Sequence, residues 1–442
     1  MTPPKPRSRQ GRVGPLRYLR LMRRDILSAQ PERLYRAKMA EFRVPFLRSV
    51  LVNDPDLVDL VLKRRPTDFP KSDRVSEGLR PLLGRSVFVT NGEEWRRQRR
   101  IIDPAFEGGR LRDAFPGMLA AARTAADRLF EGEHEMEEEA SHAAADVIFR
   151  TLFSIPIEHE DARAVFHAFR AYQRQAPVMR LSAYLPLPVW HSRRVRQAAR
   201  TVRSLIERMV DRRAAEIAAG TAPDDLATKI MTLPDPVTGE RFTPAEMVDQ
   251  VAIFFLAGHE TSASAMAWAL YLLATHPEWQ ERVAEELKGW PDEPGFGDLS
   301  RLKITRDVFR ETLRLYPAVP MMVRETTREE RFRGRDLPVG TQVVLSPWHL
   351  GRHERVWDAP DAFDPGRWVD AKDAARDGFL PFSAGPRVCT GAGFAMAEGV
   401  LLLAEMVRRW RFDATERVPV PVAHLTVRAE DGIWLEVRAR QT

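Results

Sequence analysis

The feature that most constrains the fold is one long helical segment, from Thr243 to about Ala274. Thr243 can cap a helix, Pro244 suits its first position, and Glu246 completes a capping box. A helix of about 31 residues spans roughly 46 Å at 1.5 Å per residue, enough to cross a whole domain. Its middle, residues 251–257, is apolar on every side. We therefore expect this helix to be buried inside a large, mainly helical body.

A polar motif, Ala257-Gly258-His259-Glu260-Thr261, interrupts this apolar helix. A glycine in a helix interior costs about 1 kcal/mol relative to alanine, and a carboxylate avoids burial unless it is paired. The hydroxyl of Thr261 can bond back to a carbonyl and open the helix locally. The motif predicts a groove for a small ligand with a proton path beside it. A tolerated kink is the alternative interpretation.

The chain has a single cysteine, Cys389. An intrachain disulfide and a zinc site of several thiolates are therefore excluded. A lone cysteine is most often an inert core residue. Here Gly385 and Gly391 flank the thiol, Arg387 precedes it by two residues, and an apolar helix pattern follows. Backbone N–H groups and a helix N-terminus stabilise a thiolate, so the pattern favours a metal ligand or nucleophile over a core thiol.

Two further patterns lie within the C-terminal third of the chain. Glu311 and Arg314 are spaced to share a helix face, and Arg367 lies in a proline-rich, aromatic loop from which it can join them. Taken alone, such a pair is most often an ordinary surface ion pair. Residues 429–433 lie between alternating apolar residues and predict a hairpin turn.

Composition bounds the class of protein. Hydrophobic residues make up 44% of the chain, enough for a sizeable core, and the net charge is +6. We expect a cytoplasmic protein with no signal peptide and no transmembrane segment, because one cysteine fits a reducing compartment and no run of about 18 apolar residues occurs. Residues 1–40 form a basic tail and lead-in, either solvated or in peripheral contact with a membrane, and residues 41–442 form a single domain. We expect no nucleic-acid partner.

Several motifs, in their order along the chain, resemble those of the cytochrome P450 family, and the resemblance covers about residues 45–440. The segment Gly351-Arg352-His353 departs from the family pattern. The matching residues are Trp95 and Arg99 of a Trp-x-x-x-Arg motif; Ala257, Gly258, Glu260 and Thr261 of the distal helix; Glu311, Arg314 and Arg367 of the Glu-x-x-Arg group; Arg324; and Phe382, Gly385, Arg387, Cys389 and Gly391 of the cysteine loop.

The resemblance implies a mainly α fold with small β-sheets, shaped as a triangular prism. It implies a haem b between the long distal helix and the helix after the cysteine loop. Cys389 is then the iron ligand, shielded by Phe382, with Gly391 passing close by. The remaining implied roles are haem-carboxylate contacts for Trp95, Arg99, Arg324 and Arg387; an oxygen site bordered by Ala257 and Gly258; proton supply by Thr261 and Glu260; and a structural group of Glu311, Arg314 and Arg367.

The implied function is that of a haem-thiolate monooxygenase. It uses O₂, two electrons and two protons to insert oxygen into a C–H bond of an apolar substrate such as a fatty acid, terpenoid, steroid or macrolide, by hydroxylation or epoxidation. The alternatives are a peroxide-dependent peroxygenase and a non-catalytic haem sensor. Glu260 and Thr261 favour the monooxygenase, because peroxide-using relatives usually lose this pair.

Partners and substrate contacts follow from family position. We expect no fused reductase, so electrons come from a separate ferredoxin or flavodoxin with its reductase and NAD(P)H. Arg96, Arg97 and Arg100 are predicted to steer an acidic donor, with a solvated face as the alternative. The segment from Met179 to Trp190 suits a lid over the substrate. The expected substrate contacts are Leu82, Phe88, Phe254, Val319 and Met321.

Overall fold

The computed structural model describes residues 2–11, 13–44, 47–107, 109–175, 192–369 and 378–440. The predicted lid, from Met179 to Trp190, lies outside these residues. The helices are α1 (Pro15–Arg24), η1 (Glu32–Tyr35), α2 (Pro55–Asp59), η2 (Leu60–Arg64), α3 (Asp73–Leu83), α4 (Gly92–Phe106), α5 (Arg110–Arg128), α6 (Met136–Phe153), α7 (Glu160–Gln175), α8 (Arg193–Ala219), α9 (Leu226–Thr232), α10 (Pro244–Thr275), α11 (Pro277–Leu287), η4 (Phe296–Arg301), α12 (Lys303–Leu315), α13 (Pro347–Gly351), η5 (Pro365–Trp368), η6 (Gly385–Arg387) and α15 (Ala392–Arg409). The strands are β1 (Met39–Val44), β2 (Leu47–Val52), β3 (Gly132–Glu135), β4 (Met322–Glu325), β5 (Glu330–Phe332), β6 (Arg335–Leu337), β7 (Gln342–Leu345), β8 (Trp410–Ala414), β9 (Pro421–Ala423), β10 (Val427–Ala429) and β11 (Trp434–Ala439).

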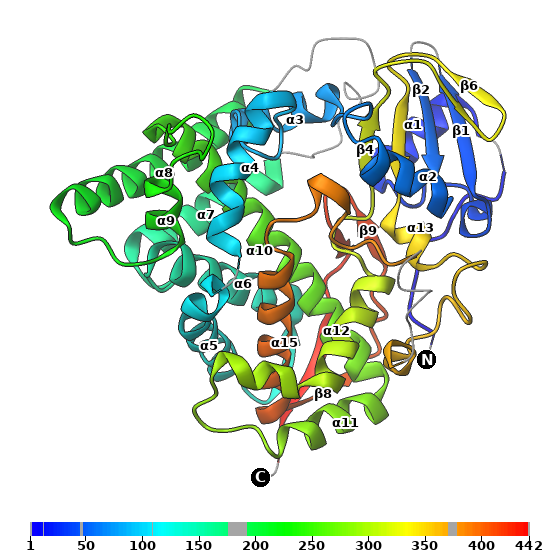
Figure 1. Ribbon diagram of the computed structural model, residues 1–442. Coiled ribbons are helices and arrows are strands. Elements are labelled where there is room, and N and C mark those ends of the chain that lie inside the picture. The colour runs from blue at the N-terminus through cyan, green and yellow to red at the C-terminus, as the bar shows by residue number, and fades with distance from the viewer. Residues whose placement is uncertain are drawn as a thin grey trace.

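The long helix α10 is the centre of the molecule. It runs through the helical part in Figure 1 and packs against α6, α8 and α15. The predicted capping box is present: the Thr243 hydroxyl accepts from the Glu246 amide, and the Glu246 carboxylate accepts from the Thr243 amide. The predicted end, Ala274, is one residue from the observed one. Nearly every residue from Met247 to Ala274 is buried, as an all-round apolar helix requires.

The sheets are small and lie beside the helices. The largest has the strand order β1-β2-β7-β4, with β2 and β7 parallel and the other pairs antiparallel. Figure 1 shows this sheet at one side of the molecule, away from α5 and α8. A second sheet has the order β3-β11-β8 and places the C-terminal strands beside the start of α6. The mainly α class with small sheets is therefore confirmed.

The predicted hairpin at residues 429–433 is wrong. The strands before and after this turn do not pair: β10 pairs with β9, whereas β11 pairs with β3 and β8. The chain diverges at the turn because the amide of Ile433 donates to the carboxylate of Glu135, at 3.0 Å, and the amide of Met136 to the carbonyl of Ile433, at 2.7 Å. The turn thus docks on the start of α6.

The basic N-terminal segment packs on the domain. The Ile26 amide donates to the Ala423 carbonyl at 3.1 Å, and the Tyr316 hydroxyl donates to the carbonyl of Pro4 at 2.8 Å. Met22 is buried against the main core. Across the described ranges, no helix combines the length and the apolarity that crossing a membrane requires.

Candidate active site

The cysteine loop is held in a tight backbone turn. The Cys389 amide donates to the Phe382 carbonyl at 2.9 Å, and the Val388 amide donates to the Gly385 carbonyl at 3.0 Å. Gly385 has a φ of +66°, and a Cβ there would lie 2.0 Å from the carbonyl oxygen of Leu62. Only glycine allows this turn and this close approach to η2.

The Cys389 thiol is exposed but has much protein close around it. Its side chain is accessible, yet desolvation by the surrounding protein raises the pKa of the thiol, against the lowering effects of the Gly391 amide and of Arg99. In the described part of the chain, no three His, Cys, Asp or Glu side chains are grouped to hold a metal ion. The thiol therefore suits a single-thiolate site, in which a metal would displace its proton.

Side chains of α4 tie this loop to the domain. Arg99 donates from Nη1 to the Val388 carbonyl at 2.8 Å and from Nε to the Asp103 carboxylate at 2.8 Å. The Thr390 hydroxyl donates to the same carboxylate at 2.9 Å. Arg99, expected at a haem carboxylate, is thus already committed in part to holding the cysteine loop.

Cationic side chains gather around the indole of Trp95. The guanidinium of Arg387 lies 4.5 Å from the ring centre, and Arg99 and the Lys71 ammonium each lie 5.9 Å from it. Residues Lys71 and Arg324 pair through an isolated β-bridge, which brings Arg324 to the same place. The structure therefore gathers the predicted residues Trp95, Arg99, Arg324 and Arg387 and adds Lys71, which the sequence reasoning missed.

Apart from the Arg99–Asp103 pair, this cation cluster has no matching carboxylate among the described residues. The Nε of Arg324 and the Nη1 of Arg387 are buried with no hydrogen-bond partner. Desolvation, with Arg387 beside it, lowers the pKa of Arg324 to about 10. Desolvation, followed by the charges of Arg387, Arg324 and Arg99, lowers the pKa of Lys71 well below its usual value. Unpaired buried cations are costly, so this arrangement fits a ligand that carries carboxylates.

One face of α10 is accessible within an otherwise buried helix. Ala257 is exposed, and Phe254, Gly258 and Thr261 are partly accessible, whereas their neighbours are buried. These four positions recur every three or four residues, so they lie on one helix face. A Cβ at Gly258 would lie 2.3 Å from the Ile148 side chain. Glycine therefore lets α6 pack closely, and α10 stays helical through the motif.

The four polar residues from His259 to Ser262 each reach a different neighbour. A buried hydroxyl, acid or imidazole needs such a partner. The contacts are His259 with Ser141 of α6 at 2.7 Å, Glu260 with the Thr426 hydroxyl at 2.9 Å and Arg428 at 3.5 Å, Thr261 with the Ala257 carbonyl, and Ser262 with Glu398 of α15 at 2.7 Å. Thr261 thus borders the accessible face, and Glu260 points toward the C-terminal strands.

The Glu311–Arg314 pair lies in the interior, with both side chains fully buried. Arg314 donates to both carboxylate oxygens of Glu311, at 2.9 and 2.7 Å, and Arg367 donates to the same acid at 2.9 Å. The remaining donors of Arg314 reach three backbone carbonyls, at Gly351, Pro360 and Ala362. All five guanidinium hydrogens are used, so this is no ordinary surface pair.

The arginine cluster of α4 is not a free cationic patch. Arg97 pairs with Glu246 at 2.6 Å, and Arg100 pairs with Asp235 at 2.6 Å and Glu93 at 2.9 Å. The hydrogen bonds that Arg100 donates to Asp235 and then to Glu93 raise its pKa. These acids, remote in sequence apart from Glu93, neutralise much of the charge that was predicted to steer an electron donor.

The expected substrate contacts divide by burial. Leu82 is 1% exposed and belongs to the core. Phe88 is 44% exposed, and Phe254, Val319 and Met321 are partly accessible. Phe254 also packs on Phe106 at 5.7 Å between ring centres, beside the start of α15. The accessible four stay candidates for substrate contact, and Leu82 acts as packing.

Comparison with known proteins agrees with this geometry. The family model described as Cytochrome P450 matches residues 31–434. Cyclooctat-9-en-7-ol 5-monooxygenase of Streptomyces melanosporofaciens is 34% identical, over 84% of this chain and 82% of its own length. Cyclooctatin synthase of the same organism is 33% identical, over 88% and 90%.

A more distant relative and a solved structure extend this likeness. Cytochrome P450 4A10 of Mus musculus is 29% identical, over 88% of this chain and 80% of its own length. The crystal structure of the cytochrome P450DA heme domain aligns with a TM-score of 0.81 at 24% identity, over 91% of this chain and 90% of that one, which bears on the fold alone. The family match covers most of the chain, and the chain therefore belongs to the cytochrome P450 family of haem-dependent monooxygenases.

Proposed function

We propose that this protein hydroxylates or epoxidises an apolar organic molecule with O₂, using haem b bound to Cys389. The observation that carries the proposal is the pairing of an accessible lone thiol, whose pKa the Gly391 amide and Arg99 act to lower, with an accessible helix face bearing Thr261. A thiolate ligand donates electron density that favours O–O cleavage. When bound, the haem supplies the iron that takes up electrons and activates O₂.

The residues present fit a haem with two carboxylates. Lys71, Arg324 and Arg387 bring positive charge to one place, and two of their buried nitrogens lack partners. Carboxylates would supply the missing acceptors. Trp95 would hold the cations in position through its ring face. Arg99 would add to this positive charge while it fixes the cysteine loop.

The polar residues of α10 would hold and transfer protons. The Thr261 hydroxyl, now bonded to the Ala257 carbonyl, borders the accessible face and would hold a water there. Glu260, next along the helix, would pass protons to that water from its pocket with Thr426 and Arg428. The substrate, O₂, two protons and two electrons would then give one oxygenated product and one water. Ala257 and Gly258 leave room beside Thr261.

Apolar side chains would select the substrate. Phe88, Phe254, Val319 and Met321 present apolar surface at accessible positions, and two relatives carry names that refer to cyclooctat-9-en-7-ol and cyclooctatin. We propose a hydrophobic substrate from among fatty acids, terpenoids, steroids and macrolides. A separate ferredoxin or flavodoxin, with its reductase and NAD(P)H, would supply electrons.

The Thr261→Ala variant tests the proposed oxygen chemistry. A panel of dodecanoic acid, limonene, progesterone and erythromycin is screened for the low-spin to high-spin shift of the haem, and the best compound is used for turnover. We expect the variant to consume NAD(P)H while its product yield falls roughly ten- to a hundredfold, since a group that positions a proton donor is lost. The missing electrons should appear as hydrogen peroxide.

The matched control is Thr275→Ala, which removes the same kind of back-bond, to Tyr271, at the far end of α10. This control should keep the parent's product yield. An undiminished yield in Thr261→Ala contradicts its role with protons. Equal turnover by the parent with peroxide alone would favour a peroxygenase, and no turnover with any electron source would favour a haem sensor.

The Lys71→Met variant tests the cation cluster. A charge-assisted hydrogen bond contributes roughly 1.5–3 kcal/mol, which corresponds to about ten- to a hundredfold in haem affinity. We expect haem to dissociate that much faster into an excess of apomyoglobin. Lys63→Met, which removes an exposed lysine paired with Asp59, should leave the rate unchanged. Unchanged dissociation in Lys71→Met would remove Lys71 from the haem site.

A further inference from the structure

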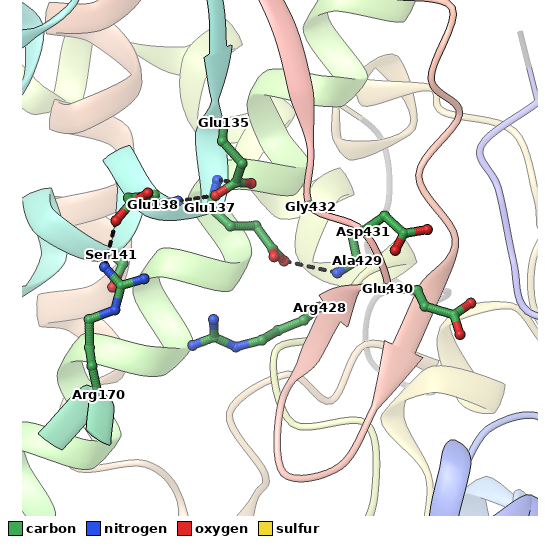
Figure 2. A pocket seen from close by; sticks show the side chains of 10 residues that line it. All are labelled: Glu135, Glu137, Glu138, Ser141, Arg170, Arg428, Ala429, Glu430, Asp431 and Gly432. Carbon is green, nitrogen blue, oxygen red and sulfur yellow. Dashed lines mark hydrogen bonds and ion pairs between the residues drawn. The ribbon is translucent and has the colours of Figure 1, made fainter. Parts of the chain in front are cut away.

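A polar pocket lies at the start of α6, beside α7 and residues 428–432. It has a volume of about 320 Å³, which is room for several waters. Figure 2 shows the carboxyl end of Glu137 and the guanidinium of Arg428 both projecting into it. The pocket is lined by Glu135, Glu137, Glu138, Ser141, Arg170, Arg428, Ala429, Glu430, Asp431 and Gly432.

Arg428 connects this pocket to the acid of the α10 motif. Its Nε lies 3.5 Å from the carboxylate of Glu260, and its side chain is about one-third exposed, whereas that of Glu260 is 11% exposed. Thr426 of the same C-terminal segment donates to Glu260. Arg428 therefore bridges an open pocket and a nearly closed carboxylate.

Glu137 faces the same arginine from α6. Its carboxylate accepts from the Ala429 amide at 2.9 Å. Desolvation raises the pKa of Glu137 to about 7, and the negative charges of Glu135 and Glu260 add to this against the charge of Arg428. Glu137 thus feels the charge of the guanidinium that forms an ion pair with Glu260. Burial is the largest of these effects, and it places the pKa of Glu137 near neutral pH.

Most of the other charged groups around Glu137 are already engaged. Glu135 accepts from the amides of Glu137 and Glu138, and Glu138 pairs with Arg170 of α7 at 2.7 Å. Of the two acids in the following turn, Glu430 pairs with Arg24 and Asp431 lines the pocket rim. The imidazole of His259 is neutral, because desolvation and then Arg428 and Arg170 lower its pKa to about 3.

We propose that Glu137 and Arg428 are positioning residues that relay protons from this pocket to Glu260. The proposal rests on the proposed function, in which Glu260 supplies protons beside Thr261. Glu137 would release its proton through pocket water to the Glu260 carboxylate and regain one from solvent, so that no electrons move. A group whose pKa lies near the working pH is the most effective carrier.

Infrared spectroscopy tests the titration without turnover. We expect pH-difference spectra of the parent holoprotein to contain a protonated carboxyl band that disappears near pH 7. The band should be absent in Glu137→Gln and retained in Glu138→Gln, which removes a neighbouring acid of the same pocket that pairs with Arg170 instead. A band that still disappears near pH 7 in Glu137→Gln, distinct from that of Glu398, whose pKa burial raises to about 8, overturns the assignment of the proton to Glu137.

Turnover with the compound selected from the spin-shift panel tests the relay. Glu137 is protonated below about pH 7, so the parent's product yield per NAD(P)H should fall as pH rises through 7. In Glu137→Gln we expect a yield about tenfold lower than the parent's at pH 6, which is the loss typical of groups that act through a neighbour. The yield of this variant should show no further fall near pH 7. Glu138→Gln should match the parent.

Conservative replacement separates charge from shape. Arg428→Lys keeps a cation and should retain most of the product yield. Arg428→Gln removes the cation, and its yield should fall as much as that of Glu137→Gln. A parental pH profile in Glu137→Gln, with the parent turning over normally, overturns the relay alone. Absence of O₂-dependent turnover in the parent overturns the proposed function, while the infrared titration still reports on Glu137.

Discussion

Replacing Cys389 with serine should abolish the long-wavelength Soret band of the reduced carbon monoxide complex and O₂-dependent turnover. Serine cannot supply the thiolate, and loss of an iron ligand should cost more than the about tenfold to hundredfold typical of outer residues around a metal. The variant should keep the parent's far-ultraviolet circular dichroism, because the loop is fixed by Gly385, Arg99 and Thr390 rather than by the thiol.

Two measurements guard this result against simple loss of haem. Cys389→His offers a nitrogen ligand and should bind haem with a Soret band at shorter wavelength. In the parent apoprotein, iodoacetamide labelling reports this thiol alone, since it is the single cysteine. Labelling should be slow at neutral pH and rise in alkali, because desolvation raises the thiol pKa. A long-wavelength band in Cys389→Ser would rule out Cys389 as the ligand.

The local parts of the site could be predicted from the sequence. The capping box of α10 is formed by residues three apart, and the turn before Cys389 needs a glycine at 385 because of its positive φ. Such features depend on residues close in sequence, where spacing fixes geometry. The pattern of residues also identified the Glu311 group. It did not predict that the group is buried, because a pair at helical spacing has the same sequence pattern on the surface and in the core.

The parts that join distant segments could not be predicted. Lys71 meets Arg324 through a bridge between segments about 250 residues apart, and Glu260 meets Thr426 across 166 positions. Likewise, the acids that pair Arg97 and Arg100, Glu246 and Asp235, come from other elements. Propensity and spacing carry no information on such contacts. One signal was available for Lys71: it is one of few lysines in an arginine-rich chain.

Replacing Glu311 with glutamine should destabilise the protein severely. The change leaves the guanidinium of Arg314, 1% exposed, without its counter-charge, and breaking a buried pair in this way costs roughly 3–5 kcal/mol. Burial already lowers the pKa of Arg314, and Glu311 is the group that opposes this effect. We expect the free energy of unfolding in urea, measured on the holoprotein, to fall by that amount.

The matched control is Glu285→Gln, whose partner Lys288 is also three residues away but exposed. An exposed pair contributes about 0–1 kcal/mol, so this variant should unfold nearly like the parent. Arg314→Lys should also destabilise strongly, because an ammonium has three donors for the five acceptor contacts that Arg314 fills. If Glu311→Gln unfolded like Glu285→Gln, Glu311 would not be the counter-charge that offsets burial of Arg314.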